Sequence, residues 1–149
     1  MSQMKNLVAK KSTLGDSAVD GLFGGLGAGI LMGVYFLAVG LVGGENPILV
    51  LSRFDPSGSA SPLTGALVHL AVASVYGMVF GIVYRFIHLD GLPPWLTGLA
   101  FSIVLLALAE IIVLPGAQSS LLHIPLWSFS AAHIIYGVTL GVLVGRAQM

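Results

Sequence analysis

Four long apolar segments divide the chain, and the stretches between them are rich in proline, glycine, serine and charged residues. The segments cover about residues 21–42, 63–84, 95–114 and 127–144. A helix needs roughly 20 apolar residues to cross a bilayer, and each segment is close to that length. Because backbone groups in lipid must be hydrogen-bonded within their own segment, all four are predicted to be helical despite their glycines.

This pattern predicts an all-α membrane protein with four transmembrane helices in an up-down bundle. Residues 1–149 form a single integral membrane domain, in which residues 1–20 are expected to be a cytoplasmic tail. Trp95 and Trp127 begin the third and fourth segments, where aromatic rings favour the membrane interface. Pro62 precedes the second segment and Pro115 follows the third, as expected for helix ends.

Glycines recur at four-residue intervals in three of the four segments. Residues four apart share one face of a helix, and in lipid a face of small residues lets two backbones approach closely. The first, second and fourth helices are therefore predicted to pack through these faces, whereas the third lacks such a series. The predicted packing residues are Gly21, Gly25, Gly29, Gly33, Gly77, Gly81, Gly137, Gly141 and Gly145.

A short motif, Tyr-Gly-x-x-x-Gly, occurs in the second helix at residues 76–81 and again in the fourth at residues 136–141. Each copy has a histidine upstream, His69 in one and His133 in the other. Parallel internal repeats of this kind occur in membrane proteins. The motif therefore predicts a pseudo-repeat of two helical hairpins.

The composition supports a membrane protein. Hydrophobic residues make up 56% of the chain and charged residues only 8%, whereas a soluble domain has about 25% charged residues. A soluble monomer is therefore excluded, and six lysines and arginines are too few for a nucleic-acid binder. The absence of cysteine excludes disulfides, thiolate zinc sites and iron–sulfur clusters. The predicted environment is the lipid bilayer.

The lysines and arginines set the predicted orientation. Cytoplasmic flanks of membrane helices carry an excess of these residues. Arg53 is the one such residue in the loops at about 43–61 and 116–126, which therefore face outward. Both termini are predicted to be cytoplasmic. The basic residues on the predicted inner side are Lys5, Lys10, Lys11, Arg85 and Arg146.

One acidic residue, Glu110, lies well inside an apolar segment, where a carboxylate is costly. With a rise of 1.5 Å per residue, Glu110, His69 and His133 all fall roughly 5–8 Å outside the midplane. Tyr35 reaches a similar level, and the histidines share the small-residue faces of their helices. The sequence therefore predicts a polar intramembrane cluster of Glu110, His69, His133 and Tyr35.

Three interpretations of this cluster stay open. The groups hydrogen-bond one another and hold the helices in register, or they relay protons or line a transport path. Alternatively, His69, His133 and Glu110 hold a zinc, iron or copper ion, or the two histidines clamp a haem. We predict no cofactor, with haem or a metal ion as the alternative.

No feature of the sequence supports catalysis. The chain has no phosphate-binding loop, and no nucleophile elbow surrounds Ser74 or Ser102. Serines at membrane depth more often bond a carbonyl of their own helix, and both are expected to do so. The protein is therefore predicted not to be an enzyme.

The order of these features resembles the YagU-like bacterial inner-membrane proteins, which have four helices. The similar stretches are GLGAGILMG, YGMVFGIVY, WLTGLAFSIVLLALAE and AHIIYGVTLGVLVG. The resemblance implies a multi-pass protein of the inner (cytoplasmic) membrane. It implies no catalytic residues.

The surplus of glycine faces and the apolar outer loop favour a role in assembly. We predict a small integral membrane protein that forms a homo-oligomer or serves as an accessory subunit with other membrane subunits. The alternatives are a transporter, channel or proton relay that uses the Glu/His cluster, and a haem- or metal-binding membrane protein.

Overall fold

The computed structural model describes residues 13–87 and 91–148, and in these ranges all regular secondary structure is helical. A π-helical segment and a 3₁₀ turn interrupt the second half of the chain. The lysine-bearing residues 1–12 of the predicted tail lie outside the described residues. The elements are α1 (Leu14–Val42), α2 (Pro47–Ser52), α3 (Pro62–Phe86), α4 (Pro94–Leu108), the π-helical segment (Ala109–Val113), α5 (Leu114–Gly116), the 3₁₀ turn (Ser120–His123) and α6 (Leu126–Gln148).

Four helices of the described residues are long and apolar enough to cross a membrane: α1, α3, α4 continued through α5, and α6. They indicate a multi-pass membrane protein. Helix α1 begins at Leu14, earlier than the expected start near Gly21, because a capping box forms there. The Thr13 hydroxyl accepts a hydrogen bond from the Asp16 backbone N–H at 3.1 Å, and the Asp16 carboxylate accepts one from the Thr13 N–H at 2.8 Å. Residues 14–20 therefore extend the helix.

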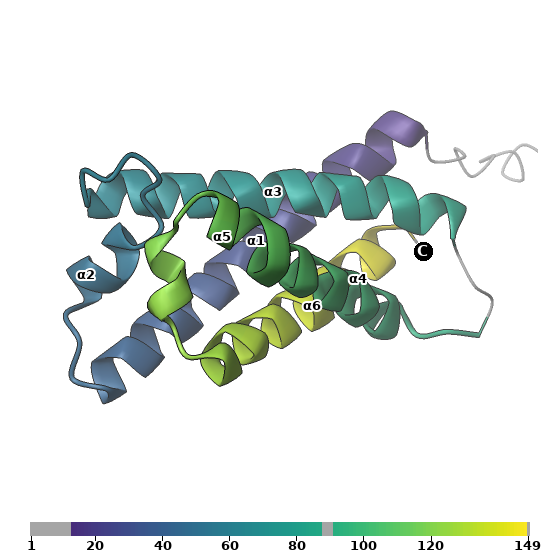
Figure 1. Cartoon of the computed structure of the whole chain (residues 1–149). Coiled ribbons are helices and arrows are strands. Elements are labelled where there is room, and N and C mark those ends of the chain that lie inside the picture. The colour runs from purple at the N-terminus through teal and green to yellow at the C-terminus, as the bar shows by residue number, and fades with distance from the viewer. Residues whose placement is uncertain (1–12, 88–90, 149) are drawn as a thin grey trace, which may run out of the picture.

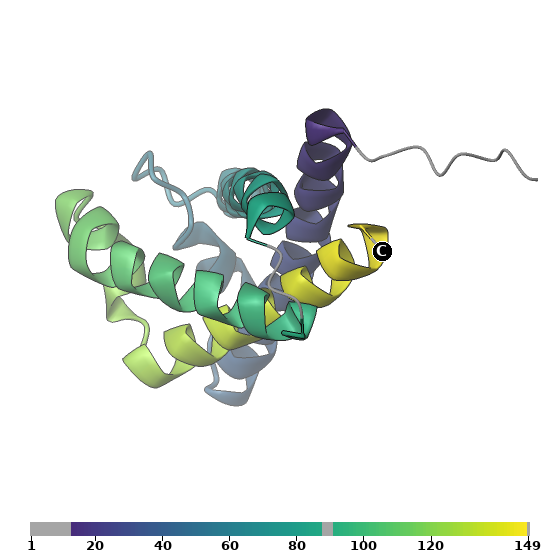
Figure 2. The ribbon, with the colours of Figure 1, turned by 90° about the vertical axis from the view of Figure 1, so that its right-hand side faces the viewer.

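The four long helices form an open arrangement. Helix α1 packs along α3, α4 packs along α6, and α1 also contacts α6, whereas α3 and α4 hardly touch. The neighbours therefore follow the order α3, α1, α6, α4, with an open seam between the first and the last (Figures 1 and 2). Figure 1 also shows the start of α1 and the end of α6 toward one end of the molecule, and α2 at the other.

Helices α1 and α3 meet backbone to backbone at glycines. A Cβ atom placed on Gly25 would lie 2.8 Å from the Gly77 Cα, and one on Gly21 would lie 2.9 Å from the Gly81 Cα. Side-chain carbons do not approach other atoms this closely, so any larger residue would force the helices apart. One turn further along, Gly29 faces the side chain of Ala73.

Helices α4 and α6 meet in the same way. The third transmembrane helix, expected to lack a glycine face, contributes Gly98, where a Cβ atom would lie 2.7 Å from the Gly141 Cα. Gly137 faces the side chain of Ser102, and Gly145 faces the ring of Pro94. Each Tyr-Gly-x-x-x-Gly motif thus packs on the long helix that precedes it in the chain.

Helix α2 closes the end of the molecule opposite the termini. Its Val50 is buried against Gly40 of α1, and the Leu51 carbonyl lies over Gly65 of α3. Arg53 forms a bidentate ion pair with Glu45, with N–O distances of 2.9 and 3.0 Å. The Ser120 hydroxyl donates to the Arg53 carbonyl at 2.9 Å, so the two loops at this end of the molecule, residues 43–61 and 117–125, are joined.

Candidate functional site

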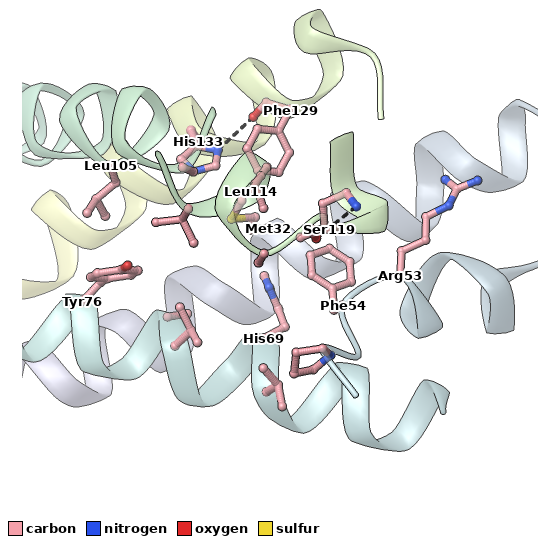
Figure 3. Close-up of a pocket in the computed structure, with 18 of the residues that line it drawn as sticks. Met32, Arg53, Phe54, His69, Tyr76, Leu105, Leu114, Ser119, Phe129 and His133 are labelled. Atoms are coloured by element: carbon pink, nitrogen blue, oxygen red, sulfur yellow. Dashed lines mark hydrogen bonds between the residues drawn. The ribbon is translucent and has the colours of Figure 1, made fainter. Parts of the chain in front are cut away.

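A cavity of about 270 Å³ lies in the half of the bundle nearest α2. Its walls come from α1, α3, α4, the π-helical segment, α5 and α6, and the two loops at the α2 end of the molecule close over it. Most of the lining side chains are apolar. Figure 3 shows the predicted site residues His69 and His133 entering from different sides, His69 from α3 and His133 from α6.

His69 bridges α3 and α1. Its Nε2 lies 2.9 Å from the carbonyl oxygen of Gly29, which can only accept, so this nitrogen carries the proton. Gly33 leaves room for the ring, because a Cβ atom there would lie 3.6 Å from Nε2, an ordinary contact distance. The ring of Phe54 packs against the imidazole with 4.8 Å between centroids.

His133 is held within α6. Its Nδ1 lies 3.0 Å from the carbonyl oxygen of Phe129, so Nδ1 donates and carries the proton. The Phe129 ring packs against the imidazole with 4.6 Å between centroids. The His133 carbonyl accepts a hydrogen bond from the buried hydroxyl of Ser102 on α4. Both the ring and the backbone of His133 are therefore fixed.

In its neutral form each imidazole keeps a second nitrogen that carries a lone pair, Nδ1 in His69 and Nε2 in His133. Neither atom has a hydrogen-bond partner among the described residues. Among the described residues, every fully buried side-chain nitrogen or oxygen has a hydrogen-bond partner. These two nitrogens have none, so they are not fully buried and their lone pairs are accessible. The cavity therefore offers two hydrogen-bond acceptors in an apolar setting.

Two tyrosines of the repeated motif also line the cavity. The Tyr136 hydroxyl donates to the Ala73 carbonyl at 2.7 Å and ties α6 to α3. The Tyr76 hydroxyl has no partner among the described residues. In the sequence both tyrosines served only as markers of a repeat, although a tyrosine next to a packing glycine lies beside a helix interface.

Glu110 and Tyr35 do not join the histidines. Neither is among the residues that line the cavity. Glu110 is half-buried within the π-helical segment, and Tyr35 packs edge-on against Phe36 with 5.8 Å between centroids. Across residues 13–87 and 91–148 no group of three His, Cys, Asp or Glu side chains could hold a metal ion. The predicted four-residue cluster is thus reduced to its two histidines.

Asp55, which no sequence pattern indicated, anchors the loop between α2 and α3 at the edge of the cavity. Its carboxylate accepts hydrogen bonds from the Ser57 hydroxyl at 2.7 Å, the Ser59 hydroxyl at 2.7 Å and the Ser61 N–H at 2.9 Å. Together these bonds hold the pKa of Asp55 far below its usual range, and the bond from Ser57 contributes most. The loop therefore carries a permanent negative charge at neutral pH.

Comparison with known proteins gives one match. No curated protein and no solved structure matches the chain. The sequence profile of a family of unknown function, DUF6789, matches residues 15–149. That match covers all four long helices and both histidines, and no link to the YagU-like proteins is shown. The chain belongs to the family of unknown function DUF6789.

Proposed function

We propose that the protein is a non-enzymatic subunit of a membrane assembly, in which a second membrane-embedded chain covers Glu110. The single observation that carries this proposal is the position of that carboxyl group. It has no hydrogen-bond or ion-pair partner among the described residues, and it does not line the cavity.

The depth of Glu110 favours a partner. It lies six residues before Gly116, where the third span ends, or roughly 9 Å inside the span at 1.5 Å per residue. Acidic side chains at such depth almost always face protein or water, since exposure to lipid is costly. The next two side chains, Ile111 and Ile112, are 73% and 62% exposed. Glu110 therefore borders an apolar face that lipid or a second chain must cover.

The local helix geometry also favours an interaction site. Residues Ala109–Val113 form a π-helical segment, and such segments are rare and frequent at functional sites. The third span is also the least buried of the four. A second copy of the chain that presented its own Glu110 would allow the two carboxyl groups to share a proton and hydrogen-bond each other.

We propose further that the protein lies in the inner membrane, with both termini cytoplasmic and successive spans running in alternate directions. Arg85 and Arg146 near the inner ends of α3 and α6 support this orientation. The loops that contain Asp55 and Ser119, and the cavity beneath them, would then face the outer side.

Disulfide trapping tests for a second copy, because the chain has no native cysteine. Ala107→Cys, exposed about one helical turn before Glu110 on the same side of the span, is expected to give a disulfide-linked dimer on mild oxidation of native membranes. The matched control Val34→Cys, 54% exposed on α1, is expected to give none. Adding Glu110→Leu to Ala107→Cys should abolish the dimer, whereas Glu110→Gln, which keeps hydrogen-bonding groups, should retain it. Equal trapping at both positions would contradict a specific interface.

A proton relay is the second candidate, and the two histidines in one cavity favour it. The inner half of the seam between α3 and α4, however, is lined mainly by apolar side chains such as Phe80, Val83 and Val104. A relay through this seam would need water to enter that apolar stretch. Proteoliposomes that move protons in a manner dependent on both histidines would favour the relay over a purely assembling role.

A further inference from the structure

The cavity lies along the open seam between α3 and α4. Val68, Val72 and Tyr76 of α3 form one wall, and Leu105 and Ala109 lie on the other. Because these two helices hardly touch, the seam faces the lipid. A molecule dissolved in the bilayer can therefore reach the cavity from the side, without crossing an aqueous phase.

The size of the cavity suits a single ring. A volume of about 270 Å³ exceeds the roughly 150 Å³ cavity that accepts benzene and falls just short of typical pockets for drug-sized ligands. Aromatic rings at its wall, among them Phe54, Tyr76 and Phe129, offer edges and faces for stacking. An aromatic head group with an alkyl tail leaving through the seam fits these dimensions.

The polar atoms of the cavity determine which hydrogen-bonding group the ring of the ligand must carry. His69 and His133 each commit one N–H to a backbone carbonyl and present only a lone pair to the cavity. A lone pair accepts a hydrogen bond, so the complementary ligand is a donor. A ligand with acceptors alone, such as an ether or a ketone, would leave both nitrogens unpaired in an apolar site.

We propose that this cavity binds a lipid-soluble phenol, the hydroquinones included, whose hydroxyl donates to the free ring nitrogen of His69 or His133. Tyr76 also lines the cavity beside the seam, and its hydroxyl offers the ligand a further polar contact. Glu110 itself does not line the cavity, so binding does not require the proposed contact at that carboxyl group.

A pair of probes that differ by one hydrogen-bond donor tests this proposal. The first probe is a 4-alkylphenol and the second is its methyl ether, which has the same apolar body. With the protein in lipid nanodiscs, the phenol is expected to bind at least about tenfold more tightly, which corresponds to about 1.4 kcal/mol. Equal affinities for the two probes, or no saturable binding of either, would overturn the proposal.

Substitutions locate the site. Loss of the accepting histidine, by His69→Phe or by His133→Phe, is expected to reduce the preference for the phenol over the ether. His123→Phe, at an exposed histidine outside the cavity, should leave the preference unchanged. Glu110→Gln should also leave it unchanged, so failure of the assembly proposal would not be mistaken for failure of this one. Retention of the full preference in both cavity variants would contradict the assignment.

A measurement on the unmodified protein covers the case in which a histidine variant fails to fold. With ¹⁵N-labelled histidine, the phenol is expected to shift the signals of the unprotonated ring nitrogen of His69 or His133 toward the hydrogen-bonded range. The methyl ether should not shift them, and the His123 signals should respond to neither probe. Unchanged signals of both cavity histidines at a saturating phenol concentration would refute the hydrogen bond.

Discussion

At the scale of single residues, side chains that donate hydrogen bonds to backbone carbonyls of other helices hold the bundle together. His69 bonds the Gly29 carbonyl, Tyr136 bonds the Ala73 carbonyl and Ser102 bonds the His133 carbonyl. A helical carbonyl has a second lone pair, so it accepts such a bond without giving up its own helix. In lipid these bonds replace the charged contacts that a soluble protein would use.

Ser102 provides the simplest test of these bonds. It was expected to bond its own helix, as Ser74 does to the Leu70 carbonyl at 2.7 Å, but it bonds α6 instead. Ser102→Ala is therefore expected to lower the free energy of unfolding by about 1 kcal/mol. Ser74→Ala, which removes a bond within one helix, should change it by less. Unfolding in mixed micelles measures both, and equal losses would contradict the assignment.

The hydrogen bonds of Asp55 predict a pH dependence in the loop between α2 and α3. Because the folded chain lowers the pKa of Asp55, the carboxylate stabilises the fold fully above the ordinary value of about 3.9. This contribution declines as the pH falls below that value toward the lower folded pKa. Carboxyl ¹³C signals should therefore show Asp55 still ionised at pH 3.9. A midpoint near 3.9 would show that the serine hydrogen bonds do not form.

At the scale of helices, glycines decide which pairs approach closely, and their roles are not equal. Gly25 lies against the backbone of α3, whereas Gly33 lies beside the ring of His69 with space for a methyl group. Both belong to the same four-residue series, so the sequence alone could not separate them. The difference arises because α1 and α3 diverge toward the end that holds the cavity.

Alanine substitutions along α1 test this difference. Gly25→Ala is expected to cost about 2 kcal/mol or more, since the added methyl group overlaps the Gly77 backbone. Gly33→Ala should change the free energy of unfolding by less than about 1 kcal/mol, because its Cβ atom meets only ordinary contacts. The unfolding midpoints of the two variants are compared in one detergent mixture. Equal destabilisation would contradict the described packing of α1 on α3.

Helical periodicity explains how much of the site could be predicted. His69 and His133 lie in register with the glycine series of their helices, and both line the cavity. The third span offered no such series, so its rotation was unknown. Gly98 and Ser102 set that rotation against α6, and Ala109 then lines the cavity. Glu110, about 100° further round the helix, does not.

At the scale of the whole molecule, two helix pairs joined on one side leave a seam on the other. The α1–α3 pair and the α4–α6 pair are each closed by glycines, and contact between α1 and α6 holds them together. The spans and the class of fold followed from the apolar pattern. The seam between α3 and α4 could not be predicted from that pattern, because it depends on which helix pairs lack contacts.

The proposed orientation is tested by chemical labelling of single cysteines in intact cells. His123→Cys, exposed in the outer loop, is expected to react with a membrane-impermeant maleimide. Ala147→Cys, exposed near the end of α6, should react only after the membrane is permeabilised. The reverse pattern would invert the topology and place the cavity on the cytoplasmic side.

The mass of the complex, extracted from native membranes in lipid particles without detergent, tests the central proposal most directly. A subunit of an assembly should appear in native mass spectrometry well above the 15.4 kDa of one chain, as a multiple of that mass or with another chain. Glu110→Leu should shift the population toward the single chain. A wild-type protein found only as a single chain, with no partner, would contradict the proposed assembly.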